Sequence, residues 1–379
     1  MTPFVQDADF TLLVGDAREA LGTLDADSVD CVVTSPPYYA LRDYGVAGQM
    51  GAEESPAAYV ASLVSVFAEV RRVLKPTGTV WLNLGDSYST KQNSGTGWDS
   101  STLTKPGGRA RKIQVAQEAS MATSRMRYDV PEKNLLLMPA RVALALQTDG
   151  WWVRQDNIWS KPNALPESAT DRPSLAHEHV FLLTKNSRYT YDAAAVKEPA
   201  KWERWGDQTT PKNNPGRASF IKPRGKQELL AEHAPGSASR TVVGFNARWD
   251  ESIANGDVAP DRNLRSVWEI PTEPNTWAAC IDCDAVFDRS VSAENHETAT
   301  GHKLAPHFAA FPKKLARTCI LAGCPAEGLV IDPFAGSGTT LLEARRLDRR
   351  CIGIELRPAY GRLIAARMAQ LSLLAEPAA

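Results

Sequence analysis

Asp332-Pro333-Phe334-Ala335-Gly336-Ser337-Gly338-Thr339-Thr340 lies near the end of the chain and follows the apolar run Leu329-Val330-Ile331. A second motif, Thr34-Ser35-Pro36-Pro37-Tyr38, follows another apolar run at residues 29–33. Runs of this kind indicate buried parallel strands. Open α/β sheets bind ligands at the carboxyl ends of their strands. We therefore predict an α/β sheet in which the two motifs form one site.

The glycine-containing motif is predicted to hold a nucleotide-like cofactor. Gly336 and Gly338 allow a tight turn with positive φ, and a helix opening at Thr339 would offer free N–H groups. Glu355 ends the next apolar run, 17 residues after Gly338, where an acidic residue can accept hydrogen bonds from ribose hydroxyls. The spacing is not GxGxxG and no Lys follows, which disfavours dinucleotides and triphosphates. An ordinary strand–turn–helix connection is the alternative.

The Ser-Pro-Pro-Tyr motif is predicted to hold a flat base. Pro36 and Pro37 restrict φ and lack N–H groups, which leaves carbonyl oxygens available to a ligand. Ser35 adds a hydroxyl acceptor and Tyr38 a planar face for stacking. Together they can clamp an exocyclic amino group on an aromatic ring, whereas the alternative is a Pro-rich turn with a half-buried Tyr.

The two motifs together resemble those of the DNA amino-methyltransferases. In that family [Asp/Asn/Ser]-Pro-Pro-[Tyr/Phe/Trp] acts on the base, and Asp-Pro-Phe-x-Gly-Ser-Gly-Thr binds S-adenosylmethionine. The catalytic motif comes first here, as in the circularly permuted β group. The resemblance covers roughly residues 9–192 and 305–370, and other matching stretches are Leu13–Asp16, Leu82–Tyr88, Asp171–Pro173, His177-Glu178 and His307–Pro312.

The resemblance implies a circularly permuted, Rossmann-like α/β methyltransferase sheet. It implies methyl transfer to an exocyclic amino group of double-stranded DNA after the base flips out of the helix. Ser35 stands where adenine-specific relatives usually carry Asp, which favours cytosine N4 over adenine N6. The implied catalytic residues are Ser35, Pro36, Pro37 and Tyr38, and the implied cofactor residues are Asp16, Phe311, Pro312, Asp332, Phe334, Gly336, Gly338, Thr339 and Glu355, with His307 as a further candidate.

A third pattern, absent from that family, is Cys280-x2-Cys283-x12-His296-x5-His302. This is the spacing of a Cys2His2 zinc finger, whose ligands a knuckle and a helix supply. Phe287 occupies the position of the usual core aromatic residue. We expect bound Zn²⁺ and a finger helix that contacts DNA, although the metal could equally staple a loop too small to fold alone, and chance spacing is the alternative.

Changes in composition divide the chain into four segments. Residues 1–190 are expected to form the first part of the catalytic domain and residues 305–379 its cofactor-binding part. Between them we expect a target-recognition region at 191–278 and the zinc-finger-like insertion at 279–304. Two other functions compete: a catalytically silent zinc-finger protein that binds DNA, and an amino-methyltransferase acting on RNA or protein.

The composition fits a cytoplasmic enzyme without a membrane segment. No apolar stretch reaches eighteen residues, and the six scattered cysteines do not form a disulfide framework. Net charge is −1, yet residues 88–130 carry seven Lys and Arg against three Asp and Glu. We therefore expect contacts with DNA phosphates to come from local basic stretches rather than from a basic protein as a whole. The expected state is monomer or homodimer, with a cognate restriction endonuclease as a candidate partner.

Overall fold

The computed structural model describes residues 1–41, 48–90, 128–199, 261–274, 276–288, 290–304 and 311–375. Most of the basic stretch at residues 88–130, most of the recognition region and His307 lie outside these residues. Contacts divide the chain into two units, residues 1–192 with 265–379, and residues 193–264. In the smaller unit, β7 (Glu198–Pro199) pairs antiparallel with β8 (Asp261–Arg262).

Within the described residues of the larger unit, nine strands form one sheet in the order β1-β2-β13-β12-β3-β4-β6-β5-β9. The run from β2 to β4 is parallel, whereas β6 is antiparallel to both of its neighbours. The carboxyl ends of β3 and β12 therefore lie side by side, as the two motifs require. The strands are β1 (Val5–Gln6), β2 (Phe10–Val14), β3 (Val29–Thr34), β4 (Leu74–Leu84), β5 (Trp152–Ser160), β6 (His177–Thr184), β9 (Val267–Glu269), β12 (Leu329–Asp332) and β13 (Arg350–Glu355).

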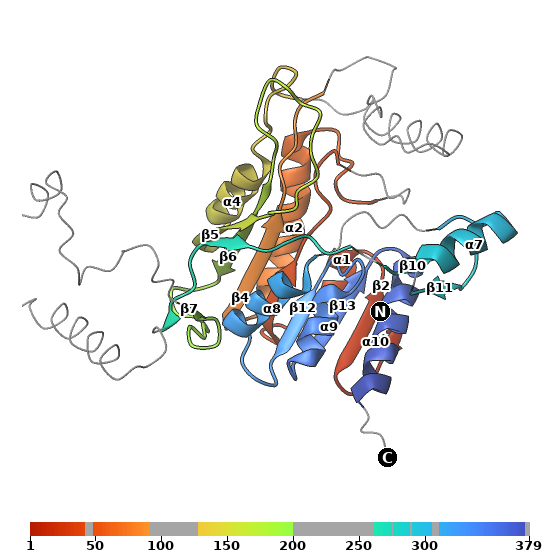
Figure 1. Cartoon of the computed structure of the whole chain (residues 1–379). Helices are drawn as coiled ribbons and strands as arrows, with labels where there is room; N and C mark the ends of the chain where they lie inside the picture. The colour runs from red at the N-terminus through yellow and green to blue at the C-terminus, as the bar shows by residue number, and fades with distance from the viewer. Residues whose placement is uncertain are drawn as a thin grey trace, which may run out of the picture. The chain divides into compact units, whose positions relative to one another are not determined.

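Helices cover both faces of this sheet (Figure 1). One core joins alternate strand residues such as Val32, Val80 and Leu82 to helices α1, α2 and α4. Strand residues that point to the opposite face of the sheet lie beside the second helix layer. Trp81 lies next to Gly323 of this layer, and Leu12 lies near Gly353, against which Leu341 packs. The helices of the first layer are α1 (Ala17–Gly22), α2 (Pro56–Val73) and α4 (Met138–Thr148), and those of the second are α8 (Lys313–Gly323), α9 (Thr339–Arg346) and α10 (Pro358–Ala375).

Local chemistry sets several helix ends. The Ser55 side chain accepts a hydrogen bond from the Ala58 amide at 3.1 Å, and Pro56 occupies the first turn of α2, where it loses no hydrogen bond. Helix α4 begins at Met138, directly after Leu137, which takes a left-handed conformation (φ 55°). None of the described helices is long and apolar enough to cross a membrane.

Residues 265–278 lie with the larger unit rather than with the recognition region to which the sequence assigned them. Strand β9 pairs parallel with β5, and the amide of Ile158 donates to the carbonyl of Ser266 at 2.7 Å. The Trp159 indole also donates to the carbonyl of Ile270 at 2.7 Å. These contacts extend the sheet by one strand.

A substitution at Gly323, the last residue of α8, can test how tightly the second helix layer packs on the sheet. An alanine Cβ there would lie 2.3 Å from Thr79 Oγ1 and 2.4 Å from Trp81 Nε1. We expect Gly323→Ala to lower the free energy of unfolding by about 1–3 kcal/mol through overpacking. The matched control is Gly22→Ala at the end of α1, which would meet no atom within 4 Å. Urea unfolding midpoints decide: equal midpoints for the two variants would contradict this packing.

Candidate active site and candidate metal centre

The two sequence motifs meet at the carboxyl edge of the sheet. Thr34 Oγ1 donates a hydrogen bond of 2.6 Å to Asp332 Oδ1, and both residues are buried. Thr340, in the first turn of α9, donates to the carbonyl of Val33 at 3.3 Å. The structure thus joins the Ser-Pro-Pro-Tyr segment directly to the glycine-containing segment.

The cofactor segment forms a tight turn that closes on Glu355. Gly336 and Gly338 have φ of 54° and 79°, which favour glycine. The amides of Gly336 and Arg357 donate to the two Glu355 carboxylate oxygens at 2.9 and 3.0 Å. Burial raises the pKa of Glu355 to about 7, against the lowering effect of these amides. A carboxylate has about four acceptor positions, so Glu355 retains capacity for hydroxyl donors such as those of a ribose.

Asp332 is buried in the same turn. Its Oδ1 also accepts from the Phe334 amide at 3.1 Å. Burial raises the Asp332 pKa to about 6, and the hydrogen bond from Thr34 acts in the opposite direction. Since Asp332 is held by donors from both motifs, it fixes the position of the turn.

The structure places the remaining predicted cofactor residues around this turn or at neighbouring helix starts. Phe334 is half-buried and Thr339 is buried in the first turn of α9. Asp16 caps α1, because its side chain accepts a hydrogen bond of 2.8 Å from the Arg18 amide. The preceding residue, Gly15, donates its amide to the Glu355 carbonyl at 3.0 Å. Phe311 and Pro312 precede α8, with Pro312 as its N-cap.

Contacts with α2 and with Gly85 hold the Ser-Pro-Pro-Tyr segment in place. The Tyr59 hydroxyl of α2 donates to the Pro37 carbonyl at 2.9 Å. The Tyr38 ring lies against Gly85, where an added Cβ would come within 2.6 Å of Tyr38 Cε2. The Ser35 hydroxyl donates to the Tyr38 hydroxyl at 3.2 Å. The two side chains that were predicted to meet the base are therefore linked to each other.

Three polar residues to which the sequence assigned no role complete this site. The Tyr38 hydroxyl donates to Glu178 Oε2 at 2.5 Å. Asn83 Nδ2 donates to the same oxygen at 2.6 Å and also contacts the Tyr38 hydroxyl. The other Glu178 oxygen accepts from the Lys161 ammonium. Asn83 and Glu178 lie in stretches that resemble the family, whereas no sequence signal indicated Lys161.

The four residues of the finger pattern also come together. One ligand atom from each of Cys280, Cys283, His296 and His302 lies within 4.8 Å of the others. Ligand bonds of 2.0–2.3 Å place the atoms around a tetrahedral zinc about 3.3–3.8 Å apart, so small movements would suffice. The His302 Nδ1 atom is buried and has no hydrogen-bond partner among the described residues. The arrangement fits a Cys2His2 zinc centre.

The elements that carry these four residues dock on α10. Strands β10 (Ala278–Ala279) and β11 (Val286–Phe287) form a small hairpin, and α7 (Ser290–Thr300) follows it. Arg362 of α10 donates through Nη2 to the carbonyls of Cys280 and Cys283 at 3.0 and 3.1 Å. Apolar contacts support the same interface through Ala279, Ala359, Tyr360 and Leu363. Figure 1 shows the hairpin beside α10.

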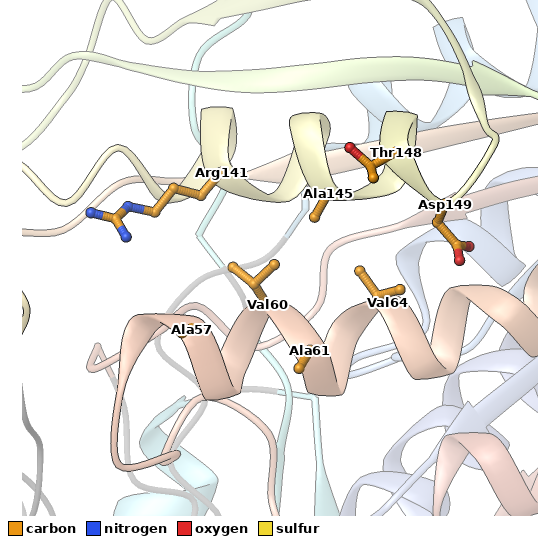
Figure 2. Close-up of a pocket in the computed structure, with 8 residues that line it drawn as sticks. All are labelled: Ala57, Val60, Ala61, Val64, Arg141, Ala145, Thr148 and Asp149. Atoms are coloured by element: carbon orange, nitrogen blue, oxygen red, sulfur yellow. The ribbon is translucent and has the colours of Figure 1, made fainter.

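A groove lies between α2 and α4 (Figure 2). Its lining is mostly small and apolar, with Arg141 toward one end and Asp149 toward the other. None of its residues belongs to either motif, so we do not assign it a role in catalysis. The lining residues are Ala57, Val60, Ala61, Val64, Arg141, Ala145, Thr148 and Asp149.

Comparison with known proteins agrees with this site. Residues 29–366 match the N6/N4 methyltransferase family, described as DNA methylase. The Type II methyltransferase M.SmaI of Serratia marcescens is 37% identical over 361 residues, 94% of this chain and 90% of that protein. M.Cfr9I of Citrobacter freundii is 34% identical over 354 residues, 92% of this chain and 84% of that protein.

A solved structure described as PvuII DNA methyltransferase (cytosine-N4-specific) shares the fold. It matches with a TM-score of 0.56 at 18% identity, covering 99% of this chain and 94% of that chain. The matching family spans most of the sheet and both motifs. The chain therefore belongs to the DNA methylase family of N6 and N4 methyltransferases.

Proposed function

We propose that this protein transfers the methyl group of S-adenosylmethionine to cytosine N4 at specific sites in double-stranded DNA. One observation carries the proposal: the hydrogen bond between Thr34 and Asp332 joins the Ser-Pro-Pro-Tyr clamp to a turn suited to a nucleoside. Family membership supports the DNA substrate. Intact residues in both motifs argue against a catalytically silent DNA-binding protein.

The residues of the chain would act mainly by positioning. S-adenosylmethionine, when bound, supplies an electrophilic methyl group on a sulfonium. Glu355 would accept hydrogen bonds from its ribose, while Asp332 and the glycines hold the turn. Ser35 Oγ and the Pro36 carbonyl would accept the two N–H bonds of the target amino group and favour a pyramidal nitrogen. Fixed geometry of this kind can contribute several kcal/mol, about 7–11 at best, and the proton then leaves to solvent.

Two further points support the assignment to this branch of the family. Ser35 in place of Asp favours cytosine N4, as does the shared fold with a protein described as cytosine-N4-specific. The catalytic motif precedes the cofactor motif, which supports the circularly permuted group. Type II relatives support a cognate restriction endonuclease as partner, and the composition of the region predicted at residues 191–278 supports a role in target recognition.

Identification of the methylated base tests the proposed function. We expect DNA from a host that expresses the chain to contain N4-methylcytosine, because Ser35 presents a neutral acceptor to the target amino group. Mass spectrometry of digested DNA measures it. The Ser35→Ala variant is the control, and we expect it to methylate at least about 100-fold more slowly with unchanged cofactor affinity. N6-methyladenine without N4-methylcytosine would overturn the choice of base.

The raised pKa of Glu355 predicts a pH-dependent affinity for S-adenosylmethionine. A carboxyl group with a pKa of about 7 is largely protonated at pH 6 and ionised at pH 8. Ribose hydroxyls donate best to the ionised form, so affinity should rise over this interval as binding releases a proton. Glu355→Gln should weaken binding about tenfold at pH 8 and flatten the profile. Calorimetric titration at several pH values would refute this if the two profiles ran parallel.

We also propose that Cys280, Cys283, His296 and His302 bind Zn²⁺ in a structural site. Helix α7 carries two glutamates and no Lys or Arg, a charge that disfavours contact with phosphates. The Arg362 contacts fasten the knuckle to α10 instead. These observations favour a structural zinc site, which stabilises the segment between β9 and α8, over a zinc finger that reads DNA.

Metal content and exchange test the zinc proposal. We expect about one zinc per chain by atomic spectroscopy, and Cys283→Ser should lose it and speed amide exchange of residues 278–304, because a segment this small has little core of its own. Asn295→Ala, an exposed position on the same helix, is the matched control. It should retain zinc and site preference. Absence of zinc would end the proposal, and a changed site preference in Asn295→Ala would favour a DNA-reading finger.

A further inference from the structure

We propose that Glu178 fixes the direction of a hydrogen-bond chain that makes Ser35 an obligatory acceptor, and that this direction selects an amino group over a carbonyl at the target position. Glu178 is thus a positioning residue for specificity. The inference rests on the proposed function and adds to it the basis on which the clamp rejects the wrong functional group.

The direction of the chain follows from donor and acceptor counts. An ionised carboxylate accepts hydrogen bonds and donates none. The Tyr38 hydroxyl must therefore donate its single proton to Glu178, at 2.5 Å. The Tyr38 oxygen then has no proton left to donate to Ser35, so it accepts from Ser35 at 3.2 Å, and it accepts from the Asn83 amide as well. Ser35 has no other proton, and the Asn83 amide faces one of its two lone pairs at 3.4 Å, so the second lone pair is what Ser35 can offer to a base.

Tyr38 and Asn83 keep this direction from reversing. Burial, together with the nearby Glu178 carboxylate, raises the pKa of Tyr38 well above its usual value, so the phenol keeps its proton. Asn83, which is 1% exposed, directs its NH2 group toward Glu178 Oε2 at 2.6 Å and Ser35 Oγ at 3.4 Å. Rotating this amide would set its carbonyl oxygen against the carboxylate. The Tyr38 hydroxyl, the Asn83 amide and the Lys161 ammonium consequently all donate to Glu178.

Lys161 explains why a carboxylate can persist in this position. The side chains of Lys161 and Glu178 are only 18% and 13% exposed. The ammonium donates to Oε1, so Oε2 is left for Tyr38 and Asn83. It also lies 4.5 Å from the centre of the Trp159 ring, a favourable cation–π distance. A buried charge is tolerated when it is paired and hydrogen-bonded in this way.

The chemical consequence is discrimination at one atom of the base. An exocyclic amino group donates to the Ser35 lone pair, whereas a carbonyl at the same position would face it oxygen to oxygen. Sites built to bond one polar group reject analogues that leave buried partners unpaired. For a cytosine target the rejected analogue is uracil, and for an adenine target it is hypoxanthine.

Glu178→Gln tests the direction without removing the side chain. Lys161 holds the amide oxygen on its own side, so the NH2 group would face Tyr38 and Asn83 and the chain could reverse. Once the methylated site is mapped, affinity is measured for duplexes with cytosine or uracil, or with adenine or hypoxanthine, at the target position. We expect turnover to fall about 100-fold, unchanged affinity for S-adenosylmethionine and at least about tenfold less discrimination between the two bases.

Further variants distinguish an effect of Glu178 on the direction of the hydrogen bonds from a merely structural role of this residue. Lys161→Met combined with Glu178→Gln lets the amide turn its oxygen toward Tyr38, so the double variant should recover part of the lost discrimination. Tyr38→Phe should lose discrimination, and Glu132→Gln, at an exposed position, should change nothing. Unchanged discrimination in Glu178→Gln, or an additive loss in the double variant, would overturn the inference. A wild-type protein that methylates no DNA would instead refute the proposed function.

Discussion

The hydrogen bond from Thr34 to Asp332 is the contact on which the arrangement of the site depends. Its two residues end adjacent parallel strands and are separated by 298 positions in the chain. Both are buried, so losing either partner would leave an unsatisfied polar group, at a cost of about 1–3 kcal/mol. One bond therefore fixes the two loops relative to each other, and the proposed methyl transfer requires that these loops keep a fixed separation.

Sequence reasoning predicted the features that depend on local pattern. The apolar runs before Thr34 and Asp332 are strands, the glycines at 336 and 338 have positive φ, and the spacing from Cys280 to His302 brings four ligand atoms together. Each of these follows from a few consecutive residues or from one repeat distance. The family then supplied how the two motifs combine.

The features that sequence reasoning missed depend on which strands become neighbours in the sheet. Glu178 reaches Tyr38 because β6 pairs antiparallel with β4, with Asn83 opposite Val180. Nothing near Lys161 in the sequence indicates a charge partner 17 residues away. Strand β9 has three residues, too few for a period to show, and its place in the sheet depends on hydrogen bonds to β5. In each case the pairing of strands, rather than local preference, decides the contact.

Of the three carboxylates of the site, Asp332 and Glu355 are buried and Glu178 is partly buried, and they are balanced in two different ways. Asp332 and Glu355 have no salt bridge within the described part of the chain, and burial raises their pKa values to about 6 and about 7. Glu178 is paired with Lys161. Asp332 accepts from Thr34 and Phe334 within the protein, whereas the hydroxyl donors of a nucleoside would complete Glu355. Glu178 orients Tyr38 before any base arrives, so its charge must be balanced within the protein itself, and the lysine beside it does this.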